Sequence, residues 1–549
     1  MTSLVSRARG AWPELGRGPL AALAVFVVLI VFMMWPQVLH IRDSATAHQD
    51  VYFNMWRLAW VAHALSSSPS HLFDGNIFYP EPRTLTFSDA MLVEGVIAAP
   101  LIWIGVKPVL VHNLMMLGAI AVSALGIFML VRYLTGSRGA ALLAGVIFAF
   151  APYRHEHIMH MELQWTMWMP WAFLALHRTL DTGRWRDGIA AGLAVALQML
   201  SSIYYGIFLA TLLAFAGALL LIRDRAVTFG RALAPLALGA LIAGVICAAY
   251  AVPYLRTRDT LGERPGAEVV TYSARPSNYL VATPSNWLYG RTFARRGGPE
   301  RRLFPGALAV LLAMIGLLLR IPSRRQIVYL IAMVAAFEMS LGFGGYAYTF
   351  LHGHVSVYRG LRAPARLGIF VVMFLGVLAA YGYDAIATSL APPTRRVLLV
   401  VLLAIMLVEY RAAMPLVQYA NAPSGVYRVL AQQPRGPVAE FPVWRRDPPG
   451  RDAEYAYMST FHWMPLLNGY SGMYPASYLT RLARLRSFPQ RTAIAELRQS
   501  GVRYVIVHAA SYPYDWFEAM RQELVTKPGV AELGLFQDDD GPAGLYILH

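Results

Sequence analysis

Charged residues are scarce in this sequence. Asp, Glu, Lys and Arg make up 14% of the 549 residues, whereas hydrophobic residues make up 57%, and the mean hydropathy is +0.46. An ordinary soluble domain carries about 25% charged residues. Because the apolar residues form many long runs, the composition excludes a soluble enzyme and predicts a polytopic membrane protein.

Cysteine and lysine are almost absent. The one cysteine, Cys247, lies inside an apolar run, so the chain has neither a disulfide framework nor a cysteine-based metal site. Lysine occurs only at Lys107 and Lys527, so arginine supplies the net charge of +16. The arginines recur between apolar runs, where membrane topology and anionic headgroups account for most of them. Nucleic-acid binding is therefore not indicated.

Several familiar catalytic motifs are also missing. The sequence has no Gly-rich phosphate loop, no nucleotide-binding motif and no Ser-His-Asp pattern. The segment from Tyr153 to Glu162 contains His155 and Glu156, but Met159 stands where the second histidine of His-Glu-x-x-His would be. This spacing excludes a zincin, although so many titratable groups at the end of an apolar helix still indicate a functional site.

The arginine-bearing connections order the chain across a membrane. We expect those at 132–138, 178–186, 223–231, 320–325 and 395–396 to face the cytoplasm together with the N-terminus, where Arg7, Arg9 and Arg17 precede the first apolar run. That run predicts a retained first span rather than a signal peptide. About eleven spans of roughly 20 residues follow, near 19–36, 110–131, 138–152, 163–178, 187–202, 204–222, 232–252, 304–320, 326–342, 367–387 and 395–412.

Long segments between these spans fall on the outer face. The loop 37–109 has a helical period at 51–65, which predicts an amphipathic helix lying at the interface, and a short apolar stretch at 91–106, which predicts a re-entrant segment. Residues 413–549 contain no run long enough to span and alternate short strands with helices. The chain therefore divides into a membrane domain, 1–412, and a small soluble α/β domain, 413–549, which an odd number of spans places outside.

This order of elements resembles the GT-C fold glycosyltransferases that use polyprenyl-phosphate sugars, such as protein mannosyltransferases and the lipid A aminoarabinose transferase. The resemblance covers roughly residues 15–410 and is most specific in His-Gln-Asp-Val-Tyr-Phe-Asn-Met-Trp around Asp50 and in the stretch 113–152. The chain is also similar to bacterial membrane proteins with Ile-Phe-Tyr-Pro at 77–80, Leu-Phe-Pro-Gly at 303–306 and an outer C-terminal domain. The resemblance implies a plasma-membrane enzyme of bacteria with its catalytic face and C-terminal domain in the periplasm or outside the cell.

The resemblance also implies site residues. A first-loop aspartate of GT-C enzymes acts as the general base on the acceptor or helps to hold a metal, and the matching position is Asp50. Asp50 would equally suit the cap of a helix that begins at Val51, and Asp43 is its nearest competitor. Second-loop acids of the family correspond to Glu156 and Glu162. Of the side chains in this segment, we expect His157, His160 and Glu162 to face the site.

The leaving phosphate of such a donor requires positive charge in a partly dry site, which predicts roles for outer arginines. We expect Arg154, Arg362 and Arg366 to bind it, and we expect His157, His160, Asp89, Tyr204 and Tyr205 to contact substrate. A divalent metal held by His157, His160 and Glu162 stays an open alternative, because imidazole and carboxylate are both competent ligands.

The sequence thus predicts an inverting glycosyltransferase that moves a sugar from a polyprenyl phosphate, within membrane lipid, to an extracytoplasmic glycan, lipid or protein. Two other classes compete with it. A transporter or flippase would show internal repeats and charges at mid-membrane, whereas here no repeat is evident and the charges gather at outer ends. The other is a non-catalytic scaffold for envelope assembly.

Overall fold

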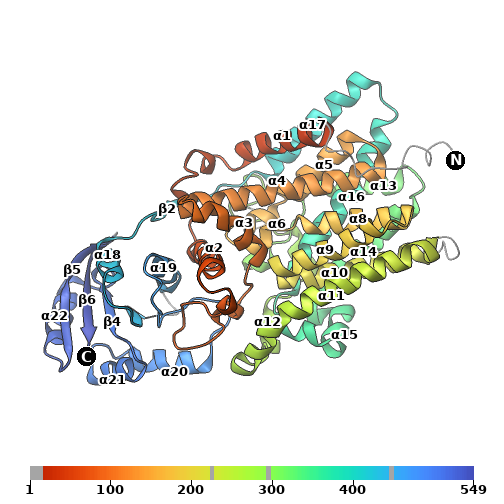
Figure 1. The fold of residues 1–549 in the computed structure, drawn as a ribbon. Coiled ribbons are helices and arrows are strands. Elements are labelled where there is room, and N and C mark those ends of the chain that lie inside the picture. Colours follow the sequence, from red (N-terminus) through yellow and green to blue (C-terminus); the bar gives the residue numbers. More distant parts are fainter. Residues whose placement is uncertain (1–16, 223–227, 292–297, 444–449, 539) are drawn as a thin grey trace.

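The computed structural model describes residues 17–222, 228–291, 298–443, 450–538 and 540–549. Helices form one end of the molecule, and a small domain containing a sheet forms the other (Figure 1). Arg7, Arg9 and residues 223–227 of one arginine-bearing connection lie outside the described residues. The mostly helical class with a C-terminal α/β domain agrees with the expectation from composition.

Each of the eleven apolar ranges expected from hydropathy coincides with a helix. Boundaries differ by a few residues at most of these helices and by more at the range 232–252, whose helix continues to Leu261; the range 163–178 begins later, at Trp168, because Met161–Gln164 forms the separate short helix α7. The helices are α1 (Arg17–Met33), α4 (Pro108–Thr135), α5 (Arg138–Phe150), α8 (Trp168–Thr182), α9 (Trp185–Ser201), α10 (Ile203–Leu221), α11 (Thr228–Leu261), α13 (Ala307–Leu318), α14 (Arg324–Ser340), α16 (Gly368–Ala387) and α17 (Pro392–Tyr410).

Fewer of these helices have the length and composition of a membrane span. Within the described residues, four are long and apolar enough to cross a bilayer: 108–135, 203–221, 230–261 and 364–387. Others, such as α13 with 12 residues, are shorter than the roughly 20 residues that a hydrocarbon core requires. The count of about eleven spans is therefore not confirmed.

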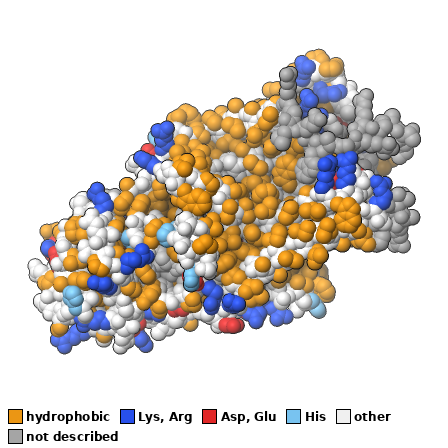
Figure 2. Space-filling model, in the orientation of Figure 1, with side chains coloured by type: hydrophobic (Ala, Val, Ile, Leu, Met, Phe, Trp, Pro, Cys, Tyr) orange, Lys and Arg blue, Asp and Glu red, His pale blue; other side chains and the backbone are white. Residues whose placement is uncertain are grey.

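Arginine-bearing turns meet at the end of the helical part that lies away from the sheet domain. Asp181 at the end of α8 accepts a hydrogen bond from Tyr133 of α4 at 2.6 Å and pairs with Arg325 of α14 at 2.7 Å. Apolar side chains cover the middle of the molecule, and Lys and Arg gather beyond them at that end (Figure 2). This distribution matches an apolar belt with a basic margin. Which side of a membrane the margin faces stays a prediction.

The loop 37–109, expected from the sequence to lie on the outer face and here called the first outer loop, contains helix α2 (Gln49–Ser67) and the apolar helix α3 (Leu92–Trp103). Helix α3 has 12 residues, about 18 Å at 1.5 Å per residue, so it is too short to span. The expected position of α2 is wrong: it packs between α3 and α19 (Asp452–Met458), with Trp56 fully buried, rather than lying at a lipid interface. Its apolar face meets protein because the C-terminal domain covers it.

The C-terminal domain is built on a four-stranded sheet of order β3-β4-β6-β5, in which β3 and β4 are parallel and the other pairs are antiparallel. Gly501, with φ of +73°, follows helix α21 (Arg491–Gln499) and ends it before β4 (Tyr504–His508). Strand β1 (Ser44–Thr46) of the outer loop pairs with β2 (Leu416–Gln418) and ties the two parts together. The remaining elements are α18 (Gly425–Ala431), β3 (Val438–Phe441), α20 (Ala476–Leu485), α21 (Arg491–Gln499), β4 (Tyr504–His508), α22 (Tyr514–Val525), β5 (Val530–Asp538) and β6 (Gly541–Leu548).

A buried histidine links three strands of this sheet domain. His508 lies 2.7 Å through Nδ1 from Asp538 and 2.8 Å through Nε2 from Glu440, and all three side chains are buried. Burial alone would lower the pKa of His508, but its hydrogen bonds to the two carboxylates raise it to about 9. The imidazole is therefore charged at neutral pH.

We expect the C-terminal domain to lose stability in mild alkali. A folded-state pKa raised from 6.5 to about 9 contributes stability that is fully present below pH 6.5 and is lost as pH rises through 9. Hydrogen exchange of the sheet amides, measured on the full chain in detergent between pH 7 and 10, reports the free energy of unfolding and therefore this loss. His508→Gln should flatten the pH dependence, and an unchanged slope in that variant would assign it to another group.

Candidate functional site

The first turn of α2 carries Asp50. His48 precedes the helix in extended conformation, and its Nδ1 accepts a hydrogen bond from the Asp50 backbone N–H at 3.1 Å. The helix cap is thus His48, and the expectation that Asp50 itself caps a helix from Val51 is wrong. A carboxylate in the first turn is stabilised by the helix dipole.

Both oxygens of the Asp50 carboxylate have partners. Tyr470 of the C-terminal domain donates its hydroxyl to Oδ1 at 2.7 Å, and Nε2 of His160 lies 2.9 Å from Oδ2. Burial would raise the pKa of Asp50, but the hydrogen bond and charge of His160, with His48 and Tyr470, hold it well below its ordinary value. Asp50 is therefore ionised throughout the physiological range.

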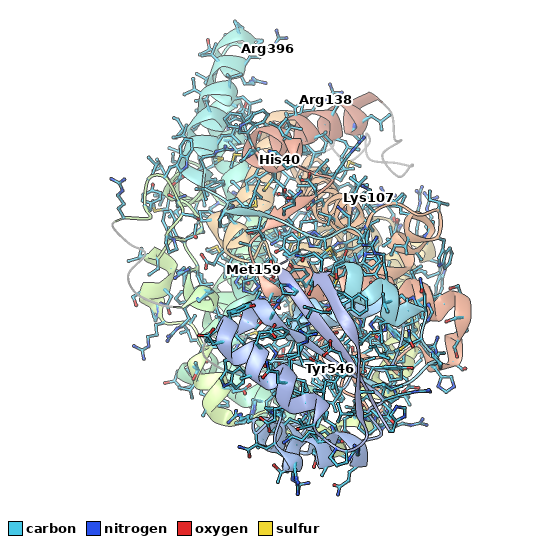
Figure 3. The ribbon with its side chains drawn as sticks, turned by 90° about the vertical axis from the view of Figure 1, so that its left-hand side faces the viewer. His40, Lys107, Arg138, Met159, Arg396 and Tyr546 are labelled. Carbon is cyan, nitrogen blue, oxygen red and sulfur yellow. The ribbon has the colours of Figure 1, made fainter. Side chains whose placement is uncertain are left out.

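The segment 153–162 forms two short helices, α6 (Pro152–Glu156) and α7 (Met161–Gln164), joined by a turn. Asn54 of α2 donates its side-chain N–H to the carbonyl of Met159 at 2.8 Å and so holds this turn against α2. Figure 3 views the molecule from the side of the C-terminal domain, with Tyr546 on β6 in front and Met159 behind. The turn therefore lies inside the molecule, between helices and sheet domain.

Glu162 and Glu156 point to different surroundings. Glu162 pairs with Arg57 of α2 at 2.9 Å and lies beside Asp50 and His160 in one cavity, whereas Glu156 pairs with Arg302 at 2.6 Å away from it. Burial would raise the pKa of Glu162, but the charges of Arg57 and His160 lower it. The Glu156 carboxyl has a pKa raised by burial, which its hydrogen bonds do not offset.

Three further predicted residues do not reach the cavity. Arg154 is buried and donates to the hydroxyl of Thr166 at 2.5 Å and the carbonyl of Gln164 at 3.0 Å, so it braces its own loop. Tyr205 is fully buried, with its hydroxyl 3.2 Å from that of Tyr153. His157 is 1% exposed, and burial lowers its pKa to about 3. The expectation that these residues contact donor or substrate is therefore not supported by their positions.

The expected metal ligands do not form a common set. Nδ1 of His157 lies 3.4 Å from Nδ1 of His160, and Nε2 of His157 lies 3.9 Å from Glu300, while Glu162 pairs with Arg57. Across the described part of the chain, no group of three or more His, Cys, Asp or Glu side chains has the arrangement of a metal site.

Two of the predicted arginines, Arg362 and Arg366, also belong to the site. Arg366 makes a two-pronged contact with Glu300, at 2.6 Å from Nη2 and 3.1 Å from Nε, and lies over the Tyr204 ring. The backbone N–H of Arg362 donates to the Tyr204 hydroxyl at 2.9 Å, and its guanidinium lies over the Tyr272 ring. The charge of Arg366 is thus balanced by Glu300, whereas Arg362 contributes positive charge to the cavity.

One cavity of about 660 Å³ joins these groups. Asp89 also lines it, and this carboxylate accepts from the Ile203 N–H at 2.8 Å; burial raises its pKa to about 6. Leu255 of α11 and Val357 line the cavity and remain 61% and 53% exposed, so apolar side chains form part of its mouth, together with the exposed Arg258 and Arg359. Of the predicted residues, the cavity is lined by Asp50, Asp89, His160, Glu162, Tyr204, Arg362 and Arg366; other lining cations are Arg57, Arg258, Arg264 and Arg359.

Arg57 and Tyr470 are among the lining residues that were missed from the sequence. Arg57 could have been found, because it is the only charged side chain on the otherwise apolar helix at 51–65. Tyr470 gave no such signal, since it lies 420 residues from its partner Asp50 in a Gly-rich turn.

No protein-family model and no curated protein matches this sequence. Among solved structures, the apo form of the Archaeoglobus fulgidus oligosaccharyltransferase is similar with a TM-score of 0.46 and 13% identity, covering 89% of this chain and 69% of that chain. The arabinosyltransferase EmbB from Mycobacterium smegmatis is similar with a TM-score of 0.37 and 14% identity, covering 70% of this chain and 31% of that chain. At these values neither structure assigns a function to this chain.

Proposed function

We propose that this protein is an integral membrane glycosyltransferase that transfers a sugar from a polyprenyl-phosphate donor to an extracytoplasmic hydroxyl acceptor. The observation that carries this proposal is the composition of one cavity. It combines a mouth with apolar side chains on α11, a group of arginines and an ionised aspartate. A lipid chain, its phosphate and the acceptor hydroxyl require these three environments in turn.

The apolar side of the cavity suits a lipid tail. Helices α9, α10 and α11 contribute it, and α11 is long and apolar enough to cross a bilayer while most of its surface remains uncovered by protein. The exposed Leu255 and Val357 flank the mouth. Because the tail would pass from one apolar environment to another, its entry costs little free energy. A polyprenyl chain can therefore enter sideways from the membrane while its phosphate meets the arginines.

The reaction would proceed as a single displacement. The acceptor oxygen attacks the anomeric carbon as the bond from that carbon to the phosphate oxygen breaks, and the phosphate leaves with the electron pair. The acceptor proton passes to Asp50. Because the pKa of Asp50 is low, transfer occurs late, when the acceptor oxygen gains positive charge on bonding to carbon. The configuration at the anomeric carbon inverts.

The direct test is sugar transfer by the purified full chain. Polyprenyl-phosphate hexoses and pentoses labelled in the sugar are supplied with hydroxyl acceptors, and transfer and donor hydrolysis are both followed. Transfer that depends on the lipid phosphate supports the proposal. Absence of both donor binding and hydrolysis for every lipid-linked sugar would remove it and return a transporter or scaffold to consideration.

We expect Arg362→Gln to weaken use of the donor. The change removes a positive charge that faces the leaving phosphate, and charge-assisted hydrogen bonds contribute about 1.5–3 kcal/mol. The value of kcat/KM for the donor should therefore fall about 10- to 100-fold. Arg396→Gln, an exposed change at the far end of α17 (Figure 3), is the matched control and should behave as wild type. Equal effects of the two changes would contradict a phosphate contact.

A further inference from the structure

A loop of the C-terminal domain enters the cavity between the helices. Residues 468–473 precede α20, and Tyr470, Ser471, Gly472 and Met473 line the cavity together with Asp50 and His160. The loop has the sequence Leu-Asn-Gly-Tyr-Ser-Gly from 467 to 472, whose two glycines are typical of turns. Its position means that one wall of the site comes from the domain outside the helical part.

The loop is anchored at its base by Asn468, which is fully buried. The Asn468 amide oxygen accepts from the backbone N–H of Glu440 at 2.8 Å, and its N–H groups donate to the Glu440 carbonyl at 2.9 Å and to Asp452 at 3.2 Å. These bonds join the loop to strand β3. The loop therefore moves only with the sheet.

Two contacts hold the loop beyond this base. Gly469 leaves no room for a side chain, because a Cβ there would lie 2.4 Å from the Phe78 ring, and its N–H donates to the Tyr478 hydroxyl at 3.0 Å. Further along, the Gly472 carbonyl accepts from Arg264 at 2.9 Å. The loop is thus clamped between the first outer loop and the segment after α11.

This clamped loop presents Tyr470 to Asp50. The Tyr470 ring packs edge-to-face on Phe53 of α2, with centroids 5.4 Å apart, and its hydroxyl donates to Oδ1 of Asp50 at 2.7 Å. His160 contacts the other oxygen of the carboxylate. A carboxylate held through both oxygens cannot rotate about its Cβ–Cγ bond, so its remaining lone pairs keep fixed directions into the cavity.

We propose that Tyr470 is a positioning residue for Asp50, and that the C-terminal domain is in this way a working part of the catalytic site. The inference rests on the proposed glycosyltransferase function. Loss of the hydroxyl would free the carboxylate to turn and reduce its alignment with the acceptor, while the donor would still bind at the arginines and the apolar side chains of the mouth. The effect should therefore appear in kcat and leave the donor KM unchanged.

The test compares Tyr470→Phe with Tyr504→Phe in the full chain. Both changes remove one hydroxyl and keep the ring. The Tyr504 hydroxyl donates to the Pro434 carbonyl at 2.8 Å, in the same domain but away from the cavity, so this variant is a matched control for loss of a buried hydrogen bond. We expect kcat to fall about 10- to 100-fold in Tyr470→Phe at constant donor KM, and to stay near wild type in Tyr504→Phe.

Each outcome has one meaning. An active wild type with an unaffected Tyr470→Phe, or with an equal loss in Tyr504→Phe, overturns the positioning role and leaves the proposed function intact. A loss confined to donor KM also overturns it, because positioning of the base acts after donor binding. A wild type that neither binds nor turns over any lipid-linked sugar removes both proposals. The unfolding midpoints of both variants, measured alongside, identify a loss of kcat that comes from misfolding.

Discussion

Replacing Asp50 by asparagine should reduce sugar transfer by about 100- to 10,000-fold, the range associated with loss of a positioned general base. The substitution keeps the size of the side chain and an oxygen that can still accept from Tyr470. It removes the negative charge that faces His160 and the capacity to take the acceptor proton. Steady-state transfer from a labelled lipid-linked sugar measures the loss, and donor binding should persist.

Asp43→Asn supplies the matched control for this variant. Asp43 lies seven residues earlier in the same outer loop, accepts from the Ser44 hydroxyl at 2.8 Å and does not line the cavity. Its loss should change transfer by less than about twofold, as expected for a surface substitution. Activity of Asp50→Asn equal to that of Asp43→Asn would show that the base is another group.

Hydropathy alone located the eleven helices expected from apolar runs, because long apolar runs have few other structures open to them, but it did not indicate the short helices α12 (Gly266–Thr271) and α15 (Tyr346–His354). It could not tell how many of those helices span, since α13 is apolar but short. It also misplaced α2. An apolar helix face shows that something apolar covers it, but whether lipid or protein does so depends on contacts with α19, which begins 385 residues after the end of α2.

The sequence indicated those cavity-lining residues that lie just after an apolar run. Asp50 follows the first apolar run, and His160 and Glu162 follow the third, so residues at these outer ends could be expected to meet. The neighbouring Glu156 and His157 turn away because their partners, Arg302 and Glu300, come from a segment that the sequence does not place. Spacing within a turn cannot decide which side chain faces a cavity when distant partners compete for it.

Arg57→Met should destabilise the fold by about 3–5 kcal/mol at neutral pH, the cost of leaving one member of a buried ion pair without its partner. Arg57 and Glu162 are 3% and 10% exposed, and their side chains lie 2.9 Å apart. Methionine keeps an apolar stem of similar length, although it also removes the guanidinium that lies over the Phe53 ring. The remaining carboxylate can reduce this cost by taking a proton, so the loss should shrink as pH falls toward 5.

A second ion pair separates this effect from the loss of any arginine. Arg325 and Asp181 also lie 2.7 Å apart, but they are 33% and 37% exposed, and such pairs contribute about 0–1 kcal/mol. Arg325→Met should therefore leave the unfolding midpoint in detergent nearly unchanged. The double variant Arg57→Met/Glu162→Gln should recover much of the loss, because the carboxylate that lost its partner is removed as well. Failure of that recovery would mean that Arg57 stabilises α2 through its other bonds, to Asn54 and the Asp89 carbonyl, rather than by balancing Glu162.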